Sequence, residues 1–140
     1  MSRSTETMKP GRVLVIEDNA YARQAVCLIL NRAGYDVMEA EDGEKAIGMM
    51  GSDRNESSIG AVICDLEMPH LTGSQTIAYF RQNHPLIPIV ILTGAPDFVV
   101  TEVLREQGVT DYLIKPVSEK RLLEVIRVSV RLHALRLKQS

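Results

Sequence analysis

The fold of this chain is decided by the stretch Ile63-Cys64-Asp65-Leu66-Glu67-Met68-Pro69. A continuous apolar run over residues 61–64 ends in a single carboxylate, and a Met-Pro turn follows three residues later. Consecutive apolar residues are typical of a strand that is covered on both faces, as in a parallel sheet. Functional crevices of open parallel sheets lie beyond the carboxyl ends of the strands, so Asp65 is the first candidate for a functional residue.

The composition limits the class of protein. The chain has 140 residues, enough for one domain with a full core, and it is 45% hydrophobic and 24% charged. No segment approaches the roughly 20 apolar residues that a membrane-spanning helix needs. Residues 1–10 lack the apolar centre of a secretory signal, and we expect them to form a disordered lead-in. We therefore expect a cytoplasmic globular domain with no membrane partner.

Two further counts exclude other classes. Cys27 and Cys64 lie in apolar surroundings without CxxC or Cys/His spacing, which favours buried free thiols over a disulfide or a metal pair. Residues 1–117 carry a net charge of −6, and residues 118–140 carry +4. An acidic body that ends in a basic helix argues against binding of nucleic acid by the body.

Short apolar segments alternate with segments of helical pattern along the whole chain. The predicted strands are residues 13–16, 36–40, 61–64, 88–92 and 111–114. The predicted helices are residues 19–33, 43–50, 72–83, 97–108 and 118 to near the C-terminus. Strands separated by helices favour parallel pairing through right-handed crossovers. We predict one α/β domain over residues 11–132, a flavodoxin-like (βα)5 three-layer sandwich with a parallel five-stranded sheet of order 2-1-3-4-5.

Polar residues with compatible chemistry follow four of these strands. Strand 1 is followed by Glu17 and Asp18, strand 3 by Asp65, strand 4 by Thr93 and strand 5 by Lys115. Because strands 1 and 3 are neighbours in the predicted order, three carboxylates meet and repel one another unless a cation lies among them. Mg²⁺ prefers such oxygen ligands. Each residue alone is expected to be a helix cap or a turn residue, but their joint placement predicts a phosphoryl site.

These residues carry a family resemblance. Glu17-Asp18, Asp65 with Met68-Pro69, Thr93-Gly94 and Lys115-Pro116 closely resemble the receiver domain of two-component response regulators, in its single-domain, chemotaxis-type form. The likeness covers about residues 11–132. It implies a phosphorylation-controlled signalling switch, which is not an enzyme in the ordinary sense although it catalyses its own phosphotransfer and dephosphorylation.

The resemblance also implies a role for each residue of the acceptor site. Asp65 would accept a phosphoryl group from the phosphohistidine of a histidine kinase or a histidine phosphotransfer protein. Mg²⁺ would be bound by Asp18, by Asp65 and by the backbone carbonyl of Glu67, with Glu17 acting largely through water. Thr93 and Lys115 would bind the phosphoryl oxygens.

The likeness further implies a way to transmit the signal. Tyr112, three residues before Lys115, matches the switch aromatic whose ring turns inward as Thr93 moves toward the phosphoryl group. The peptide bond between Lys115 and Pro116 would be cis, which X-Pro bonds reach at modest cost. The surface formed by helix 4, strand 5 and helix 5 would then bind a downstream protein partner, or the phosphoryl group would be relayed onward.

Glu67 adds a carboxylate at the mouth of this site, two residues after the acceptor, at a position where the family varies. Its side chain could pair with Lys115 in the resting state or repel attacking water in the phosphorylated state. We expect Glu67 to change the rate of autodephosphorylation, in a direction that the sequence does not determine.

The last helix carries two apolar stripes. Leu122, Leu123 and Ile126 are expected to face the sheet. A second set is spaced 3, 4, 3, as in a coiled coil, and consists of Val125, Val128, Leu132 and Leu135. Either this set broadens the core face and the helix frays past Leu132, or the helix protrudes and pairs with a second copy or a partner. Residues 133–140 are expected to form the basic end of this helix or a tail.

Other functions remain open from the sequence. The chain could be a receiver fragment of a longer response regulator or hybrid histidine kinase whose output domain is missing. Phosphatases of the haloacid-dehalogenase type also combine Asp, Thr and Lys with Mg²⁺, but they carry Asp-x-Asp where this chain has Asp65-Leu66-Glu67. A flavodoxin-type FMN carrier is less compatible, because strand 1 is followed by acids instead of a hydroxyl-rich phosphate loop.

Overall fold

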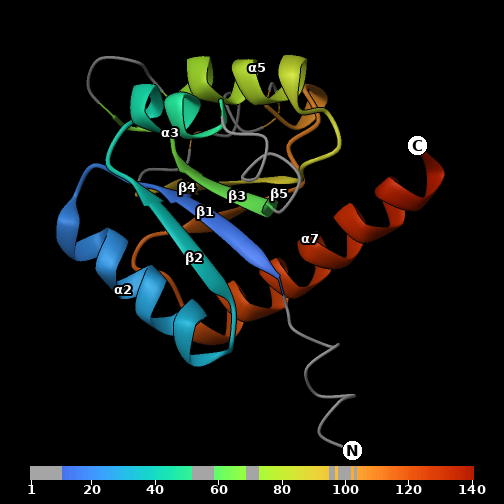
Figure 1. The fold of residues 1–140 in the computed structure, drawn as a ribbon. Helices are drawn as coiled ribbons and strands as arrows, with labels where there is room; N and C mark the ends of the chain where they lie inside the picture. The colour runs from blue at the N-terminus through green and yellow to red at the C-terminus, as the bar shows by residue number, and fades with distance from the viewer. Residues whose placement is uncertain (1–10, 52–58, 69–72, 95–96, 98–101, 103) are drawn as a thin grey trace, which may run out of the picture.

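The computed structural model describes residues 11–51, 59–68, 73–94, 97, 102 and 104–140. The elements over these residues, labelled as in Figure 1, follow one another in alternation. In chain order they are β1 (Arg12–Ile16), α2 (Ala20–Arg32), β2 (Asp36–Ala40), α3 (Gly43–Met49), β3 (Ile59–Asp65), α5 (Gly73–Asn83), β4 (Ile89–Thr93), β5 (Asp111–Ile114) and α7 (Glu119–Gln139).

The five strands form one sheet of order β2-β1-β3-β4-β5, and all four neighbouring pairs are parallel. The predicted strand order is therefore confirmed. Ile16 at the end of β1 pairs with Cys64 on β3, and Asp65 pairs with Leu92 on β4. Because the register is nearly level, the carboxyl ends of the central strands come to one edge of the sheet.

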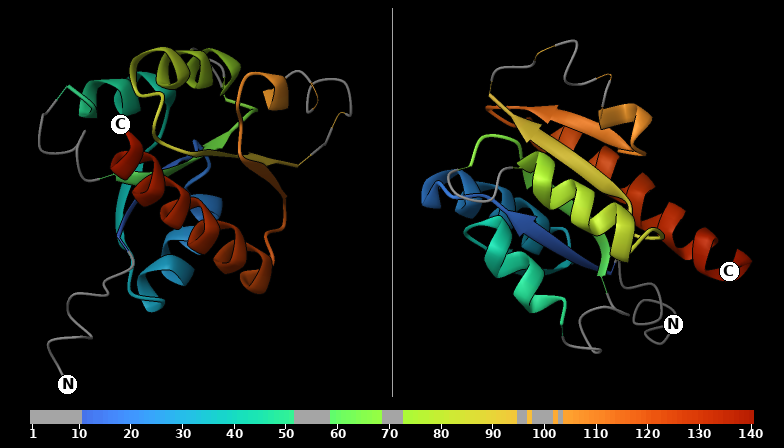
Figure 2. Two further views of the ribbon diagram at one scale, coloured as in Figure 1. Left: turned by 90° about the vertical axis from the view of Figure 1, so that its right-hand side faces the viewer. Right: turned by 90° about the horizontal axis from the view of Figure 1, so that it is seen from above.

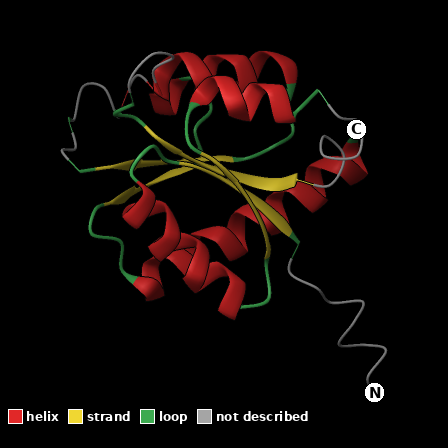
Figure 3. Cartoon of the chain, turned by 60° about the vertical axis from the view of Figure 1, so that its left-hand side comes forward, coloured by secondary structure: helices red, strands yellow, loops and turns green. Residues whose placement is uncertain are grey.

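Helices cover both faces of this sheet and make three layers. In Figures 1 and 3, α3 and α5 lie on one side of the strands and α2 and α7 lie on the other. Alternate residues of β1 enter separate cores: Leu14 packs with the α3 and α5 side, and Val15 packs with the α2 and α7 side. This two-sided burial is the reason for the continuous apolar run in the sequence.

Side-chain caps fix where several helices begin. Asn19 precedes α2, and its side chain accepts a hydrogen bond from the backbone N–H of Ala22. Asp42 caps α3 and Ser118 caps α7 in the same way. Since Asn19 and not Asp18 is the cap of α2, the Asp18 carboxylate is placed beside the end of β1 in a different role.

A predicted strand begins earlier than expected, and several predictions fall on residues outside the described part. The expected lead-in over residues 1–10 and the expected helix start at residue 72 are among them. β3 begins at Ile59, two residues earlier than predicted, and Ile59 is fully buried. Ile59 pairs with Arg12 of β1 and belongs to the core on the α3 and α5 side, so the strand extends beyond the apolar run 61–64. Of the predicted helix over residues 97–108, the structure describes helix only at Glu102 and residues 104–106, and residues 98–101 and 103 lie outside the described part.

The last helix is longer than its core-facing part. α7 continues to Gln139, and Figure 2 shows its C-terminal end extending past the sheet. Val125 of the heptad-like set is buried in the core, whereas Val128 is 59% exposed and Leu135 48% exposed. The set is therefore divided between core and solvent. Among the described helices, none combines the length and apolarity needed to cross a bilayer.

Both cysteines are buried free thiols, as predicted. Cys64 is fully buried in β3, and Cys27 on α2 is 5% exposed. Burial raises the pKa of Cys27 to about 12, with a further increase from the Glu39 carboxylate. Burial, followed by the negative charges of Asp65 and Glu17, also raises the pKa of Cys64.

We therefore expect neither thiol to react in the folded protein. The thiolate is the reactive species, and these pKa values leave almost none of it at neutral pH. With excess Ellman's reagent at pH 7.5, we expect no rapid release of thionitrobenzoate from the native protein and release equivalent to both thiols in concentrated urea. Fast native labelling of Cys27 or Cys64 would contradict this burial.

Candidate functional site

Three carboxylates meet at the carboxyl edge of the sheet. Glu17 and Asp18 follow β1, and Asp65 is the last residue of β3. One carboxylate oxygen of each lies within 4.8 Å of those of the other two. Glu17 is fully buried and Asp65 is 1% exposed, while Asp18 is exposed. The structure thus brings together the three acids that the sequence placed at two strand ends.

Lys115 inserts its ammonium group between the two buried acids. Its Nζ lies 2.6 Å from Oε1 of Glu17 and 3.3 Å from Oδ2 of Asp65. The backbone N–H of Lys115 donates to the carbonyl of Thr93 over 2.8 Å, which connects the end of β5 to the end of β4. The peptide bond between Lys115 and Pro116 is cis.

Burial and the neighbouring charges shift the pKa of the Asp65 carboxyl. Burial, together with the adjacent Glu17 carboxylate, raises the pKa of Asp65 to about 7. The backbone N–H of Glu67 and the Lys115 ammonium act in the opposite direction. Burial alone would lower the pKa of Lys115, but the two carboxylates outweigh it and the pKa of Lys115 is raised. One ammonium ion therefore does not fully offset the crowding of carboxylates.

The donor set fits a hard divalent cation. Oxygen atoms from three carboxylates are the ligands that Mg²⁺ takes in proteins. Oε1 of Glu17 is buried and forms an ion pair with the Lys115 ammonium at 2.6 Å. Glu17, Asp18 and Asp65 are thus the group that could hold a metal.

Glu67 is positioned by both its backbone and its side chain. Its N–H donates to Oδ1 of Asp65 over 3.0 Å. Its Oε1 accepts hydrogen bonds from Oγ1 of Thr93 at 2.9 Å and from the N–H of Gly94 at 3.1 Å. The sequence suggested Lys115 as a partner of Glu67 in the resting state; Lys115 instead pairs with Glu17 and Asp65, and the contact with Thr93 was not foreseen.

Tyr112 lies on β5, where it pairs with Ile91 of β4. Its side chain is half-buried and packs against the core on the α3 and α5 side of the sheet. This location places an aromatic ring on the strand next to the one that ends in Thr93. The inward rotation of Tyr112 that the sequence comparison implied stays a prediction.

Two supporting residues escaped the sequence analysis. Arg23 donates to the backbone carbonyl of Glu17 at 2.7 Å and to the Glu39 carboxylate at 3.0 Å, so it fixes the segment that carries the first two acids. Gly73, which the sequence placed only within the first turn of a predicted helix, lies directly against the end of β3. A Cβ atom on Gly73 would be 2.4 Å from the carbonyl oxygen of Asp65 and 2.5 Å from Cα of Leu66.

The signal for Gly73 was weak, because a glycine at the start of a helix is common without such a contact. The signal for Arg23 was its spacing of four residues from Asn19, which places it on the first turn of α2. Neither pattern names the backbone atoms that these residues contact. The structure adds both of them to the support of the site.

The fold and the site together define a class. A buried carboxylate at the end of a central parallel strand belongs to a group of three acids that could hold a cation, and it lies 3.3 Å from an ammonium ion. A threonine ends the neighbouring strand. This combination is suited to accept a phosphoryl group and to neutralise its charge. The class is that of phosphoryl-accepting α/β domains.

Comparison with known proteins identifies the family. The sequence model of a protein family, the response regulator receiver domain, matches residues 13–127. The chain therefore belongs to this family. Response regulator MprA of Mycolicibacterium vanbaalenii is 35% identical over 87% of this chain and 51% of its own length. Hybrid signal transduction histidine kinase I of Dictyostelium discoideum is 31% identical over 91% of this chain and 8% of its own length.

Solved structures agree with this assignment. A receiver domain protein from Clostridium thermocellum has a TM-score of 0.82 and 27% identity, covering 89% of this chain and 98% of that chain. Chemotaxis protein CheY4 of Vibrio cholerae has a TM-score of 0.77 and 28% identity, covering 85% and 98%. The assignment decides against the haloacid-dehalogenase and flavin-carrier alternatives.

The family assignment carries a general function. Receiver domains are phosphoryl-accepting signalling switches and are generally not catalytic enzymes. They bind Mg²⁺ in an acidic pocket and interact with histidine kinases or phosphotransfer partners. The chain spans about half the length of MprA and a small part of the hybrid kinase, so what those whole proteins do does not transfer to it directly.

The close approach of Gly73 generates a prediction about stability. Replacing Gly73 by Ala forces a methyl group into backbone atoms that cannot rotate away, and overpacking of this kind costs about 1–3 kcal/mol or more. We expect Gly73→Ala to lower the free energy of unfolding by this amount, measured as a lower midpoint of urea denaturation.

Gly48→Ala is the matched control. A Cβ atom on Gly48 would meet no atom within 4 Å, and the residue lies inside α3. Alanine there should stabilise the protein by about 0.5–1 kcal/mol, because glycine loses more backbone freedom on folding. Equal effects of the two substitutions would show that the contact of Gly73 with Asp65 is not tight.

Proposed function

We propose that this chain is a phosphorylation-controlled switch in which Asp65 accepts a phosphoryl group from a phosphohistidine in a Mg²⁺-dependent step. The observation that supports it best is the placement of a buried Asp65 3.3 Å from the Lys115 ammonium and within a cluster of carboxylates from β1. This carboxylate lies at the carboxyl edge of the sheet, where the functional crevices of open parallel sheets are found.

Besides Mg²⁺, the transfer needs only the residues of the site and the phosphohistidine donor. An oxygen of the Asp65 carboxylate attacks the phosphorus atom of the phosphohistidine, the P–N bond breaks, and the imidazole leaves with the bonding electrons. The product is an acyl phosphate on Asp65. The Lys115 ammonium stabilises the charge on the phosphoryl oxygens, and the Thr93 hydroxyl donates a hydrogen bond to one of them.

The cation would be held by the residues that follow the strands. Asp18 and Asp65 provide carboxylate oxygens, the backbone carbonyl of Glu67 provides a third ligand, and Glu17 acts through water. Mg²⁺, when bound, supplies positive charge that offsets the repulsion between the carboxylates and the incoming phosphoryl group. Hydrolysis of the acyl phosphate by water would reset the switch without a separate enzyme.

Transmission would run through Thr93 and Tyr112. The new phosphoryl oxygens draw Thr93 toward Asp65, and the half-buried ring of Tyr112 moves into the space beside β4. The surface around β5 then binds a downstream protein, or the phosphoryl group passes to a histidine phosphotransfer protein. The exposed Val128 and Leu135, seven residues apart on α7, would provide the surface if the chain forms a homodimer.

Labelling with a small donor tests the assignment of Asp65. With acetyl phosphate and Mg²⁺, we expect intact-protein mass spectrometry to show the addition of one phosphoryl group to the wild type and to Asp36→Asn. Asp36 is the matched control because it is the first residue of β2, at the edge of the sheet away from Asp65, and forms an ion pair with Arg12. Asp65→Asn should show none, and an adduct that persists in this variant would overturn the proposal.

The metal site gives a separate prediction. Since a cation relieves repulsion among the carboxylates, we expect Mg²⁺ to raise the melting temperature of the wild type and of Asp36→Asn. Asp18→Asn removes one ligand and should weaken Mg²⁺ binding, measured by calorimetry, by at least about tenfold. Unchanged Mg²⁺ affinity in Asp18→Asn would exclude this residue as a ligand.

A further inference from the structure

The Glu67 carboxylate accepts hydrogen bonds from two donors at the end of β4. Oε1 receives the Thr93 hydroxyl at 2.9 Å and the Gly94 N–H at 3.1 Å. At the same time the Glu67 N–H donates to Oδ1 of Asp65. Glu67, which follows β3, is therefore hydrogen-bonded both to the Asp65 carboxylate and to the two donors at the end of β4.

A hydroxyl and a backbone N–H that converge on one anionic oxygen are also the donors that suit a phosphoryl oxygen. We propose that Glu67 is a positioning residue that occupies, in the unphosphorylated protein, the place of one phosphoryl oxygen at Thr93 and Gly94. This inference rests on the proposed function. On phosphorylation of Asp65, the phosphoryl group displaces the Glu67 carboxylate, and Thr93 and Gly94 exchange one anionic acceptor for another.

The exchange has two physical consequences. A phosphoryl group gains only the difference between its own hydrogen bonds and those of Glu67. Its apparent affinity for the site is therefore its intrinsic affinity multiplied by the fraction of molecules in which Glu67 has moved away. In addition, Thr93 already points its hydroxyl to an anion next to Asp65 in the resting state. Glu67 thus sets both the apparent affinity of the site for a phosphoryl group and the extent of the further movement of Thr93.

A simpler explanation of any inhibitory effect is repulsion between the Glu67 charge and an incoming anion. The two explanations differ for Glu67→Gln. Glutamine removes the charge but keeps a carbonyl oxygen at the same reach, which can still accept from Thr93 and Gly94. Glu67→Ala removes both the charge and the acceptor.

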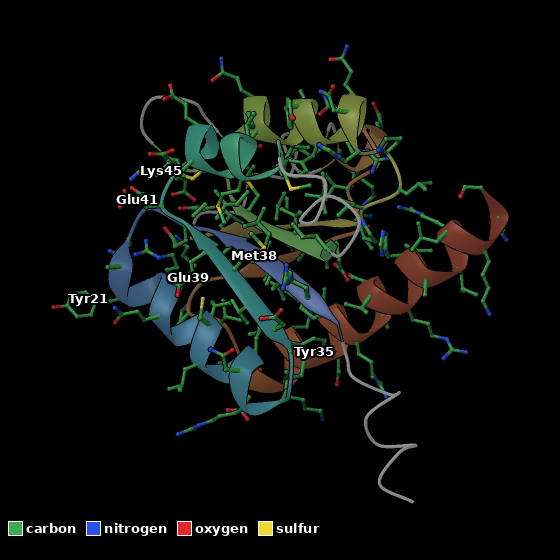
Figure 4. All side chains as sticks on the ribbon, viewed as in Figure 1. Tyr21, Tyr35, Met38, Glu39, Glu41 and Lys45 are labelled. Carbon is green, nitrogen blue, oxygen red and sulfur yellow. The ribbon has the colours of Figure 1, made fainter. Side chains whose placement is uncertain are left out.

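The test compares wild type, Glu67→Ala and Glu67→Gln with a charge control, Glu41→Ala. Glu41 follows β2 at the same end of the sheet, and Figure 4 shows it beside Lys45, with which it forms an ion pair. The first measurement is hydrogen exchange of the Gly94 amide by NMR, without metal or phosphoryl analogue. The second is the affinity for beryllofluoride, a phosphoryl analogue, in the presence of Mg²⁺.

We expect the Gly94 amide to exchange about tenfold faster in Glu67→Ala than in the wild type, because a charge-assisted hydrogen bond is lost. Glu67→Gln should retain much of the protection, and Glu41→Ala should behave as the wild type. Beryllofluoride should bind about tenfold more tightly to Glu67→Ala than to the wild type or to Glu41→Ala, with Glu67→Gln between them.

Three results would overturn the inference: an unchanged exchange rate of Gly94 in Glu67→Ala, an affinity of Glu67→Ala no higher than that of the wild type, or equal affinities of the Ala and Gln variants. Failure of the proposed function would look different, since then none of the four proteins would bind beryllofluoride at Asp65. The exchange of Gly94 reports on the Glu67 hydrogen bond in either case.

Discussion

The structure of the site depends on the burial of two carboxylates next to each other at one edge of the sheet. Glu17 and Asp65 are buried, and the Lys115 ammonium contacts both. Removing a carboxylate from water costs several kcal/mol unless it is paired, so one lysine has to be held in place for two acids. The hydrogen bond from the backbone of Lys115 to Thr93 and the level register of β3, β4 and β5 do this.

The contacts around Glu17, Asp18 and Asp65 hold the backbone that carries these acids in place. Arg23 binds the carbonyl of Glu17, and Asn19 caps α2 so that Asp18 is placed at the site without serving as the cap. Gly73 lets α5 begin against the backbone of Asp65, which leaves the acceptor strand supported from the side of α5. Each of these contacts involves backbone atoms, because the position of the strand ends determines where the carboxylates lie.

Much of this arrangement could be predicted because it follows from strand order. The apolar runs located the strands, and the residues directly after them, Asp65, Thr93 and Lys115 among them, had to meet once the sheet was parallel. The start of β3 at Ile59 could not be predicted in this way, since it depends on pairing with Arg12 of β1, which is distant in sequence. The close contact of Gly73 was invisible for the same reason: it is a distance between two backbones.

Glu67 shows most clearly where sequence reasoning ends. Chemistry alone offered Lys115 as its partner, because opposite charges attract, but Lys115 is already held by Glu17 and Asp65. The Glu67 carboxylate accepts instead from Thr93 and Gly94. In the switch that we propose, the response depends on the difference between two anions, the permanent Glu67 carboxylate and the added phosphoryl group, and therefore on how well Glu67 already satisfies Thr93.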